Sequence, residues 1–192
     1  MNAQQDRQIP EEREISQVHL GDQLDFESDA ENFFDVSFLP IDIFDHWDRC
    51  GQIADFVGYY FQHSFRAPGS HNIISTVVNE LVENAVKYSR NKSSPIEIEI
   101  RKRGEHLLMR VANLIPRNQR DHFIAICRDL FERDLDELYL EKLVHGRAEH
   151  NFSGIGLILL KKDYDVQIGI DIAPTNDGIV RVSATVDLEV AC

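Results

Sequence analysis

A carboxylate and a carboxamide stand four residues apart in this chain, at Glu80 and Asn84. Four residues is about one turn of an α-helix, so in a helix the two side chains project side by side from one face. A carboxylate can accept a proton from a nucleophile, and a carboxamide oxygen is a ligand that suits Mg²⁺. The pair indicates nucleotide chemistry, while the same spacing also fits a solvated polar stripe on an amphipathic helix.

A second candidate segment is rich in glycine and leads into an apolar run. It consists of Ser153, Gly154, Ile155, Gly156 and Leu157. Glycine lets backbone N–H groups approach phosphate oxygens at the start of a helix, where the helix dipole favours negative charge. The same glycines fit a tight turn, and we favour phosphate binding because a helix is expected to follow directly, over about residues 155–161.

The elements that must position these residues can be predicted from the spacing of apolar side chains. Helical spacing predicts helices over 45–61 and 71–89, with two shorter helices inside the charged segment 114–153. Alternating apolar residues predict strands over 18–26, 34–39, 96–100, 106–112, 166–172 and 179–190. The first helix carries aromatic residues that indicate either core or a contact surface, namely Trp47, Phe56, Tyr60 and Phe61.

Length and composition limit the classes of protein to consider. The 192 residues, 43% of them hydrophobic, predict one folded domain over 17–192 after a flexible acidic tail over 1–16. A formal net charge of −13 argues against nucleic acid or anionic lipid as a partner. No apolar run suits a membrane span or a signal peptide, so we expect a cytoplasmic protein. Three scattered cysteines indicate neither a disulfide framework nor a zinc site.

The order of these elements and motifs resembles the GHKL superfamily of ATPases and kinases, over roughly residues 34–190. The segment from Glu80 to Ser89 looks like the N-box of that superfamily, and the segment from Ser153 to Lys161 is similar to its G2 box. The resemblance implies a two-layer α/β sandwich, the Bergerat ATP-binding fold, in which a mixed β-sheet carries helices on one face. It also implies an ATP lid at about 114–153.

The resemblance further implies roles for individual residues. Glu80 would act as the base, Asn84 would bind Mg²⁺, and Lys87 would approach the phosphates of ATP. The G2-like residues Ser153, Gly154, Ile155, Gly156 and Leu157 would contact the nucleotide. Asn113 occupies the position that reads adenine, but the sequence continues as Leu114-Ile115-Pro116 where the family's G1 box has glycines. The adenine side of the site must therefore be built differently here.

Within the superfamily the chain looks most like the stand-alone anti-sigma-type serine/threonine kinases and the SiaB-like kinases of bacterial partner-switching systems. That resemblance implies ATP and Mg²⁺ as cofactors and a small anti-sigma-antagonist-type protein as the phosphorylated partner. The altered G1 segment leaves a second hypothesis open, a degenerate module that controls its partner by binding alone. A homodimer also stays open.

Overall fold

A computed structural model describes residues 16–66, 68–89, 94–145, 154–175 and 179–190. The tail expected over 1–16 lies outside the described residues except for Ser16. The strands are β1 (Val18–Gly21), β2 (Asn32–Phe38), β3 (Ile96–Arg103), β4 (His106–Pro116), β5 (Gln167–Pro174) and β6 (Ile179–Glu189). The helices are α1 (Ile41–Phe44), α2 (Asp48–Phe61), α3 (Ser70–Tyr88), α4 (Arg120–Glu132), α5 (Leu135–His145) and α6 (Ile155–Asp163). None of the described helices has the length and apolar character needed to cross a bilayer.

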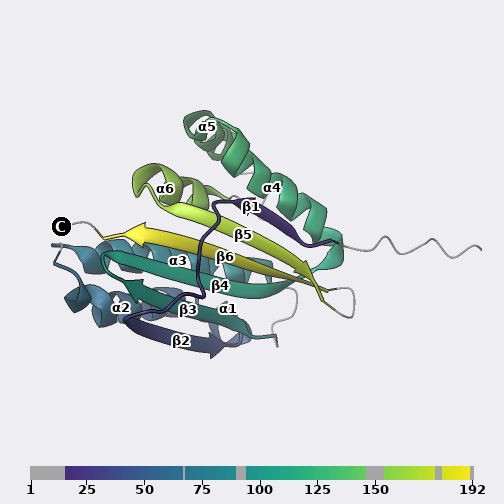
Figure 1. Ribbon diagram of the computed structural model, residues 1–192. Coiled ribbons are helices and arrows are strands. Elements are labelled where there is room, and N and C mark those ends of the chain that lie inside the picture. Colours follow the sequence, from purple (N-terminus) through teal and green to yellow (C-terminus); the bar gives the residue numbers. More distant parts are fainter. Residues whose placement is uncertain (1–15, 67, 90–93, 146–153, 176–178, 191–192) are drawn as a thin grey trace, which may run out of the picture.

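The strands form one six-stranded sheet in the order β1-β5-β6-β4-β3-β2, with helices packed on one face (Figure 1). The expected two-layer α/β sandwich is confirmed. The sheet differs in detail from the expected mixed sheet, because each described pairing is antiparallel. The helical connection between β4 and β5 does give these two strands the same direction, but β6 lies between them and runs the opposite way.

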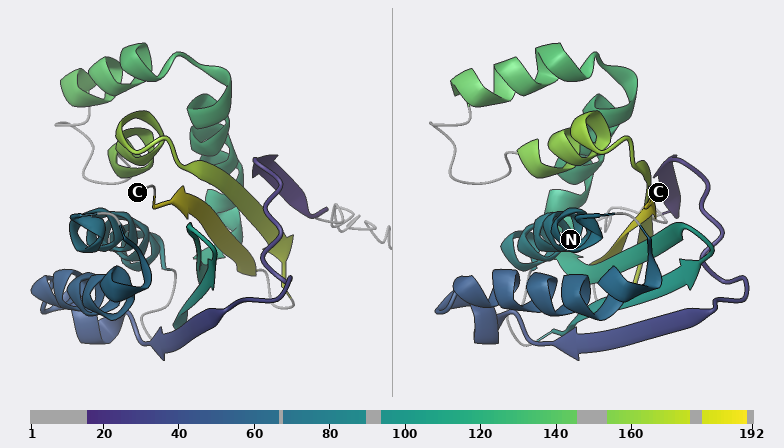
Figure 2. Two further views of the ribbon diagram at one scale, coloured as in Figure 1. Left: turned by 60° about the vertical axis from the view of Figure 1, so that its left-hand side comes forward. Right: turned by 90° about the vertical axis from the view of Figure 1, so that its left-hand side faces the viewer.

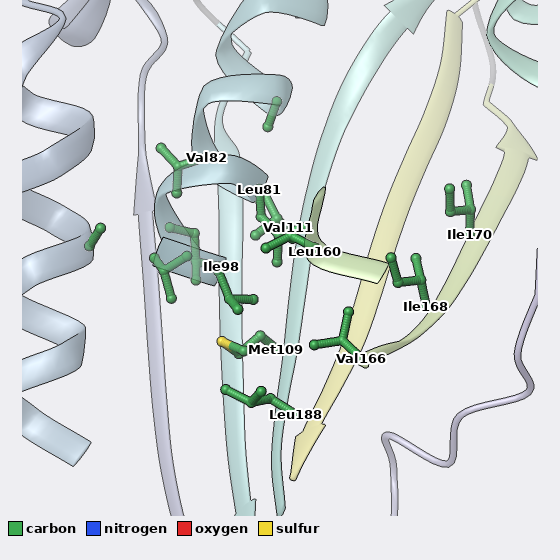
Figure 3. Close-up of a cluster of buried hydrophobic side chains, with 14 of the residues drawn as sticks. Leu81, Val82, Ile98, Met109, Val111, Leu160, Val166, Ile168, Ile170 and Leu188 are labelled. Carbon is green, nitrogen blue, oxygen red and sulfur yellow. The ribbon is translucent and has the colours of Figure 1, made fainter. Parts of the chain in front are cut away.

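Alternation along the strands builds the core between the two layers. In β3 the side chains of Ile96, Ile98 and Ile100 are buried, while the intervening Glu97 and Glu99 lie on the other face of the sheet. The apolar stripe of α3 packs on the buried face, as Figure 3 shows for Leu81 and Val82 beside the sheet residues. Burial of this stripe fixes the rotation of α3 about its axis.

The outer face of the sheet is crossed by the segment over residues 22–31, which joins β1 to β2 (Figure 1). Phe26 in this segment is buried, and its ring centroid lies 3.9 Å from the Arg110 guanidinium and 5.2 Å from that of Arg101. The expected strand over 18–26 is therefore too long. The strand ends at Gly21, whose φ of 83° turns the chain across the sheet.

The segment expected to form a lid is largely helical and packed. Residues 114–116 extend β4 and pair with β6, so this part was wrongly placed outside the sheet. The two predicted helices are present as α4 and α5, and α4 buries four side chains, Phe123, Ile124, Cys127 and Leu130. Residues 146–153 lie outside the described residues.

Candidate functional site

Helix α3 holds Glu80 and Asn84 on the face that adjoins α4 and α6. The apolar stripe of α3 must face the core, so the polar pair falls beside it, and both side chains are half-buried. The two views in Figure 2 show α6 lying alongside α3, on the same side of the sheet. The fold therefore gives the carboxylate and the carboxamide a shared, partly dry environment.

The carboxylate of Glu80 packs directly against the first turn of α6. A methyl group built on Gly156 would lie only 1.9 Å from Glu80 Oε2 and 2.9 Å from Glu80 Cδ. Gly154 is the residue just before α6 and caps its N-terminus. Its φ of 61° is a backbone conformation that favours glycine. The structure thus brings the two candidate segments together, with an anionic group at the positive end of a helix.

Burial changes the proton affinity of this carboxylate. The pKa of Glu80 is raised, mainly because burial disfavours the charged form and also because the Glu83 carboxylate is near, while Lys87 acts in the opposite direction. A raised pKa makes the ionised group a better proton acceptor than an ordinary surface carboxylate. This environment is therefore compatible with a role in accepting a proton.

Asn84 faces a small internal cavity. Its Nδ2 atom is buried and has no hydrogen-bond partner among the described residues. The cavity has a volume of about 30 Å³ and lies between α3, α4, α6 and the sheet. The side chains that line it include Leu81, Asn84, Tyr88, Asn113, Phe123 and Leu157. Asn113 is buried, and its Nδ2 donates a hydrogen bond of 3.5 Å to Ser89 Oγ.

This cavity is far smaller than a nucleotide. Small-molecule sites in proteins typically measure ~300–1,000 Å³, which is roughly ten to thirty times the volume of about 30 Å³ found here. The rings of Tyr88 and Phe123 meet edge to face with centroids 5.8 Å apart and close one side of it. The polar groups suit a nucleotide and its metal ion, whereas the space for adenine is absent unless α4 and α6 move apart.

The remaining predicted residues divide between the cavity and other surroundings. Leu157 lines the cavity, but Gly154 and Ile155 are not among its described lining residues. Lys87 is exposed and pairs with Glu83 at 3.0 Å, with its Nζ 5.6 Å from the Trp47 ring centroid. The structure therefore turns Lys87 away from the cavity. Ser153 lies outside the described residues.

Three residues near the site were not singled out as functional by sequence reasoning. Glu83 affects the pKa of Glu80 and holds Lys87, while Tyr88 and Phe123 close the cavity. Tyr88 stands one turn after Asn84, and this spacing is a signal that could have indicated a position beside the site. The place of Phe123 depends on how α4 docks, which its own sequence pattern does not encode.

A metal ion at this site would depend on few protein ligands. The described residues contain no group of three or more His, Cys, Asp or Glu side chains that could hold a metal. Mg²⁺ commonly retains water and binds through one or two protein oxygens together with substrate phosphates. A rotation of the Asn84 carboxamide exchanges its oxygen and nitrogen ends, so its oxygen can face the cavity. The donor set thus suits nucleotide-bound Mg²⁺ but not a permanent metal site.

The fold and site define a two-layer α/β protein with a carboxylate–carboxamide pair beside a glycine-led helix. No protein-family model matches the sequence, and no curated protein matches it. Among solved structures, a chain in the crystal structure of the SiaB–SiaC complex from Pseudomonas aeruginosa has the same fold, with a TM-score of 0.61 and 15% sequence identity. The match covers 83% of this chain and 91% of that chain. At this level of identity the similarity shows the fold alone.

Proposed function

We propose that this chain is a partner-switching regulator of the GHKL type that uses Mg-ATP to phosphorylate a serine or threonine of a small regulatory protein. The observation that carries the proposal is the contact between the Glu80 carboxylate and the first turn of α6 at Gly156. A polar stripe exposed to solvent would have no reason to meet a glycine-led helix start. The raised pKa of Glu80 adds support for a role in proton transfer.

Each residue of the site would have a distinct task. Bound Mg-ATP would supply the phosphoryl group. Glu80 would accept the proton of the partner's hydroxyl group as that oxygen attacks, and the Asn84 carboxamide oxygen would hold the metal ion. Backbone N–H groups of the first turn of α6 would face the phosphates once the Glu80 carboxylate, which packs against Gly156, turns toward the partner's hydroxyl group, because Gly154 and Gly156 add no side chains of their own there.

The similarity to a chain of the SiaB–SiaC complex supports a protein as the partner. That solved structure is a complex of two proteins, and the present chain shares the fold of one of its chains. We infer a small anti-sigma-antagonist-type protein as the substrate of the present chain. The partner's acceptor hydroxyl would have to reach Glu80 beside the first turn of α6, because the apolar face of α3 is packed in the core.

Nucleotide entry requires a change around the cavity. Phe123 on α4 and Leu157 on α6 stand on opposite elements of the lining, so a separation of these helices would enlarge the space between Asn84 and Asn113. Asn113 would then offer its side-chain oxygen to the adenine amino group. Because the chain lacks the G1 glycines, the separation of α4 from α6 would be the step that permits nucleotide binding.

The substitution Glu80→Gln tests the proposed chemistry. It preserves the shape of the side chain but removes the proton acceptor, so ATP binding should persist while transfer of radiolabelled phosphate to a protein from an extract of the source organism is lost. Ser75→Ala is the matched control, because Ser75 lies on the same helix but its hydroxyl group donates to Asp55 on α2. Equal transfer by wild-type protein and Glu80→Gln would overturn the assignment of Glu80 as the base.

A second candidate function is favoured by the size of the cavity. A module that controls its partner by binding alone would need no nucleotide, and the 30 Å³ cavity closed by Tyr88 and Phe123 suits such a protein. In that case Glu80→Gln and Asn84→Ala would leave control of the partner unchanged. Partner control that persists in both variants would favour the binding module over the kinase.

A further inference from the structure

Helix α4 packs beside the edge strand β1. This strand pairs with β5 alone among the described strands, and α4 lies next to it (Figure 1). The same helix carries Phe123, which lines the small cavity beside Asn84 together with Leu157 of α6. The contacts that fix α4 in place therefore also keep the cavity at its small size.

The C-terminal end of α4 is held by the last residue of β1. A methyl group built on Gly21 would lie 2.4 Å from Phe131 Cζ and 2.3 Å from the carbonyl oxygen of Ile168. The ring of Phe131 thus lies directly on the backbone of Gly21. No residue larger than glycine fits between the ring and β5 without displacing one of them.

The residue after β1, Asp22, connects this contact to α6. Its backbone N–H donates to the carbonyl oxygen of Ile168 at 2.8 Å, and its Oδ2 accepts from the Ile168 N–H at 2.9 Å. Lys161 on α6 lies with its Nζ 3.9 Å from the same Oδ2 and 5.0 Å from the centroid of the Phe131 ring. The two helices that border the cavity, α4 and α6, are therefore joined to each other and to β5 at this point.

The N-terminal end of α4 is held by the residues that lead into β1. Arg120, the first residue of α4, donates a hydrogen bond of 3.1 Å from Nη2 to the carbonyl oxygen of Ser16. The side chain of Arg120 is largely buried, with 16% of its surface exposed. Both ends of α4 are thus held by the same short segment, residues 16–22.

Strand β1 itself is attached to the sheet by few interactions. It is four residues long and has one neighbouring strand. Val18 and Leu20 are only half-buried, and one ion pair, His19 Nδ1 to Asp171 Oδ1 at 2.8 Å, adds to the pairing with β5. Segments with few buried apolar contacts open at a lower free energy than the core. Detachment of β1 is therefore an accessible local event that leaves the central strands in place.

We propose that β1 and the turn at Gly21 and Asp22 form a latch, which keeps α4 and α6 closed over the cavity until β1 detaches from β5. The part of this proposal that concerns nucleotide rests on the proposed function. Detachment would remove the contact at Phe131, the ion pair of Lys161 and the hydrogen bond of Arg120 in one step. Helix α4 is then free to move away from α6, and nucleotide that binds the open form would in turn favour the detached strand.

Hydrogen–deuterium exchange of the full chain, measured by mass spectrometry, tests whether β1 holds α4. Gly21→Ala acts from β1, because the new methyl group would meet the Ile168 carbonyl group and the Phe131 ring. Phe131→Ala acts from α4. Each variant should speed exchange of the α4 amides by about tenfold or more, while exchange in α2 keeps its wild-type rate. Phe33→Ala is the matched control, because Phe33 is 64% exposed on β2 at the opposite edge of the sheet.

A milder variant covers the case in which the two larger changes impair folding. Asp22→Asn keeps the shape of the side chain and its acceptor for the Ile168 N–H, but it loses the ion pair with Lys161. Exchange of the α4 amides should then rise by about two- to threefold, as expected from the loss of a partly exposed ion pair. Wild-type exchange of α4 in the folded variants among these three would overturn the inference.

Calorimetric titration of the same variants with Mg-ATP tests the link between the latch and the cavity. Since only the open form admits nucleotide, a larger open fraction lowers the apparent dissociation constant in proportion. Gly21→Ala and Phe131→Ala should therefore bind Mg-ATP about tenfold more tightly than the wild type, although both are less stable. Simple structural damage would weaken binding instead. Faster α4 exchange with unchanged or weaker binding would overturn the link to the cavity.

Failure of the latch and failure of the proposed function give different results. If neither the wild type nor any variant binds Mg-ATP, the proposed nucleotide function is contradicted. Faster exchange of α4 in Gly21→Ala and Phe131→Ala would still support the latch in that case. If the wild type binds Mg-ATP and α4 exchange is the same in all variants, the latch is overturned and the nucleotide function stands.

Discussion

The contact between Glu80 and Gly156 predicts a specific energetic coupling between the two residues. An added Cβ in Gly156→Ala would lie 1.9 Å from Glu80 Oε2. The carboxylate would have to withdraw by roughly 1.5 Å to restore an ordinary contact. Because the clashing atoms are at the end of a flexible side chain, we expect this to cost only about 0.5–1.5 kcal/mol. Alanine also stabilises a helix relative to glycine by about 0.5–1 kcal/mol, so the two effects nearly cancel.

A double-mutant cycle measured by urea unfolding separates these two effects. In a Glu80→Ala background nothing obstructs the new methyl group, so Gly156→Ala should then stabilise the protein by about 0.5–1 kcal/mol. Gly51→Ala on α2 is the matched control, since a Cβ there meets nothing within 4 Å and should show the helix gain alone. The coupling energy should be about 1 kcal/mol. Equal effects of Gly156→Ala in both backgrounds would refute the contact.

The same displacement has a consequence for activity. A shift of about 1 Å in a catalytic group can reduce the rate by about 100-fold. Gly156→Ala should therefore remain folded and yet lose most phosphotransfer if Glu80 is the base. Thermal unfolding and phosphate transfer, measured on the same preparation, would show this separation. Wild-type transfer together with a strong coupling energy would show that the contact exists but has no part in catalysis.

Three further predictions concern stability. The pKa of Glu80 is raised in the folded protein, so ionisation of this carboxyl group at higher pH lowers the free energy of unfolding. Glu80→Gln should therefore increase the free energy of unfolding at pH 7. This gain should vanish below about pH 4, where Glu80 is protonated in both the folded and the unfolded protein. Ile98 is a core residue with 1% exposure, so Ile98→Ala should lower the free energy of unfolding, measured by urea titration, by about 2–5 kcal/mol. Ile41 is 51% exposed, so Ile41→Ala should change the same free energy by at most about 0.5 kcal/mol. Phe26→Ala should cost about 3–5 kcal/mol and hasten proteolysis of segment 22–31; unchanged cleavage would contradict the packing of Phe26 between Arg101 and Arg110.

Strong periodic patterns allowed the elements around the site to be predicted from the sequence. The alternation of Ile96, Ile98 and Ile100 is that of a half-buried strand, and the stripe of α3 determined which side carries Glu80 and Asn84. Both features depend on residues that are near each other in the chain. The contact of Glu80 with α6 was expected only through the resemblance, since 76 residues separate Glu80 from Gly156.

Other features depend on tertiary packing and were not predictable from local patterns. The direction of strand pairing was one of them, because the sequences of β4 and β5 do not indicate that β6 lies between these two strands. The closure of the cavity was another, since it requires Tyr88 and Phe123 to meet from two helices. Lys87 was expected to lie near the phosphates, but it forms an ion pair with Glu83, which stands one helical turn earlier on α3.

The exposed aromatic residues show a related limit. Helical spacing left core and contact surface open as interpretations of the set on α2. The structure divides the set, with Phe61 fully buried and Trp47, Phe56 and Tyr60 at least 38% exposed. The division follows from the position of α2 over the last strand of the sheet, where one side of the helix has no further strand to cover.

Calorimetric titration of the purified protein with ATP, with and without Mg²⁺, tests the central proposal most directly. The account predicts micromolar binding that requires Mg²⁺ and is weakened at least tenfold by Asn84→Ala, while Ser75→Ala, on the α2-facing side of the same helix, leaves it unchanged. The absence of binding under both conditions would contradict the account and would favour a module that acts on its partner without nucleotide.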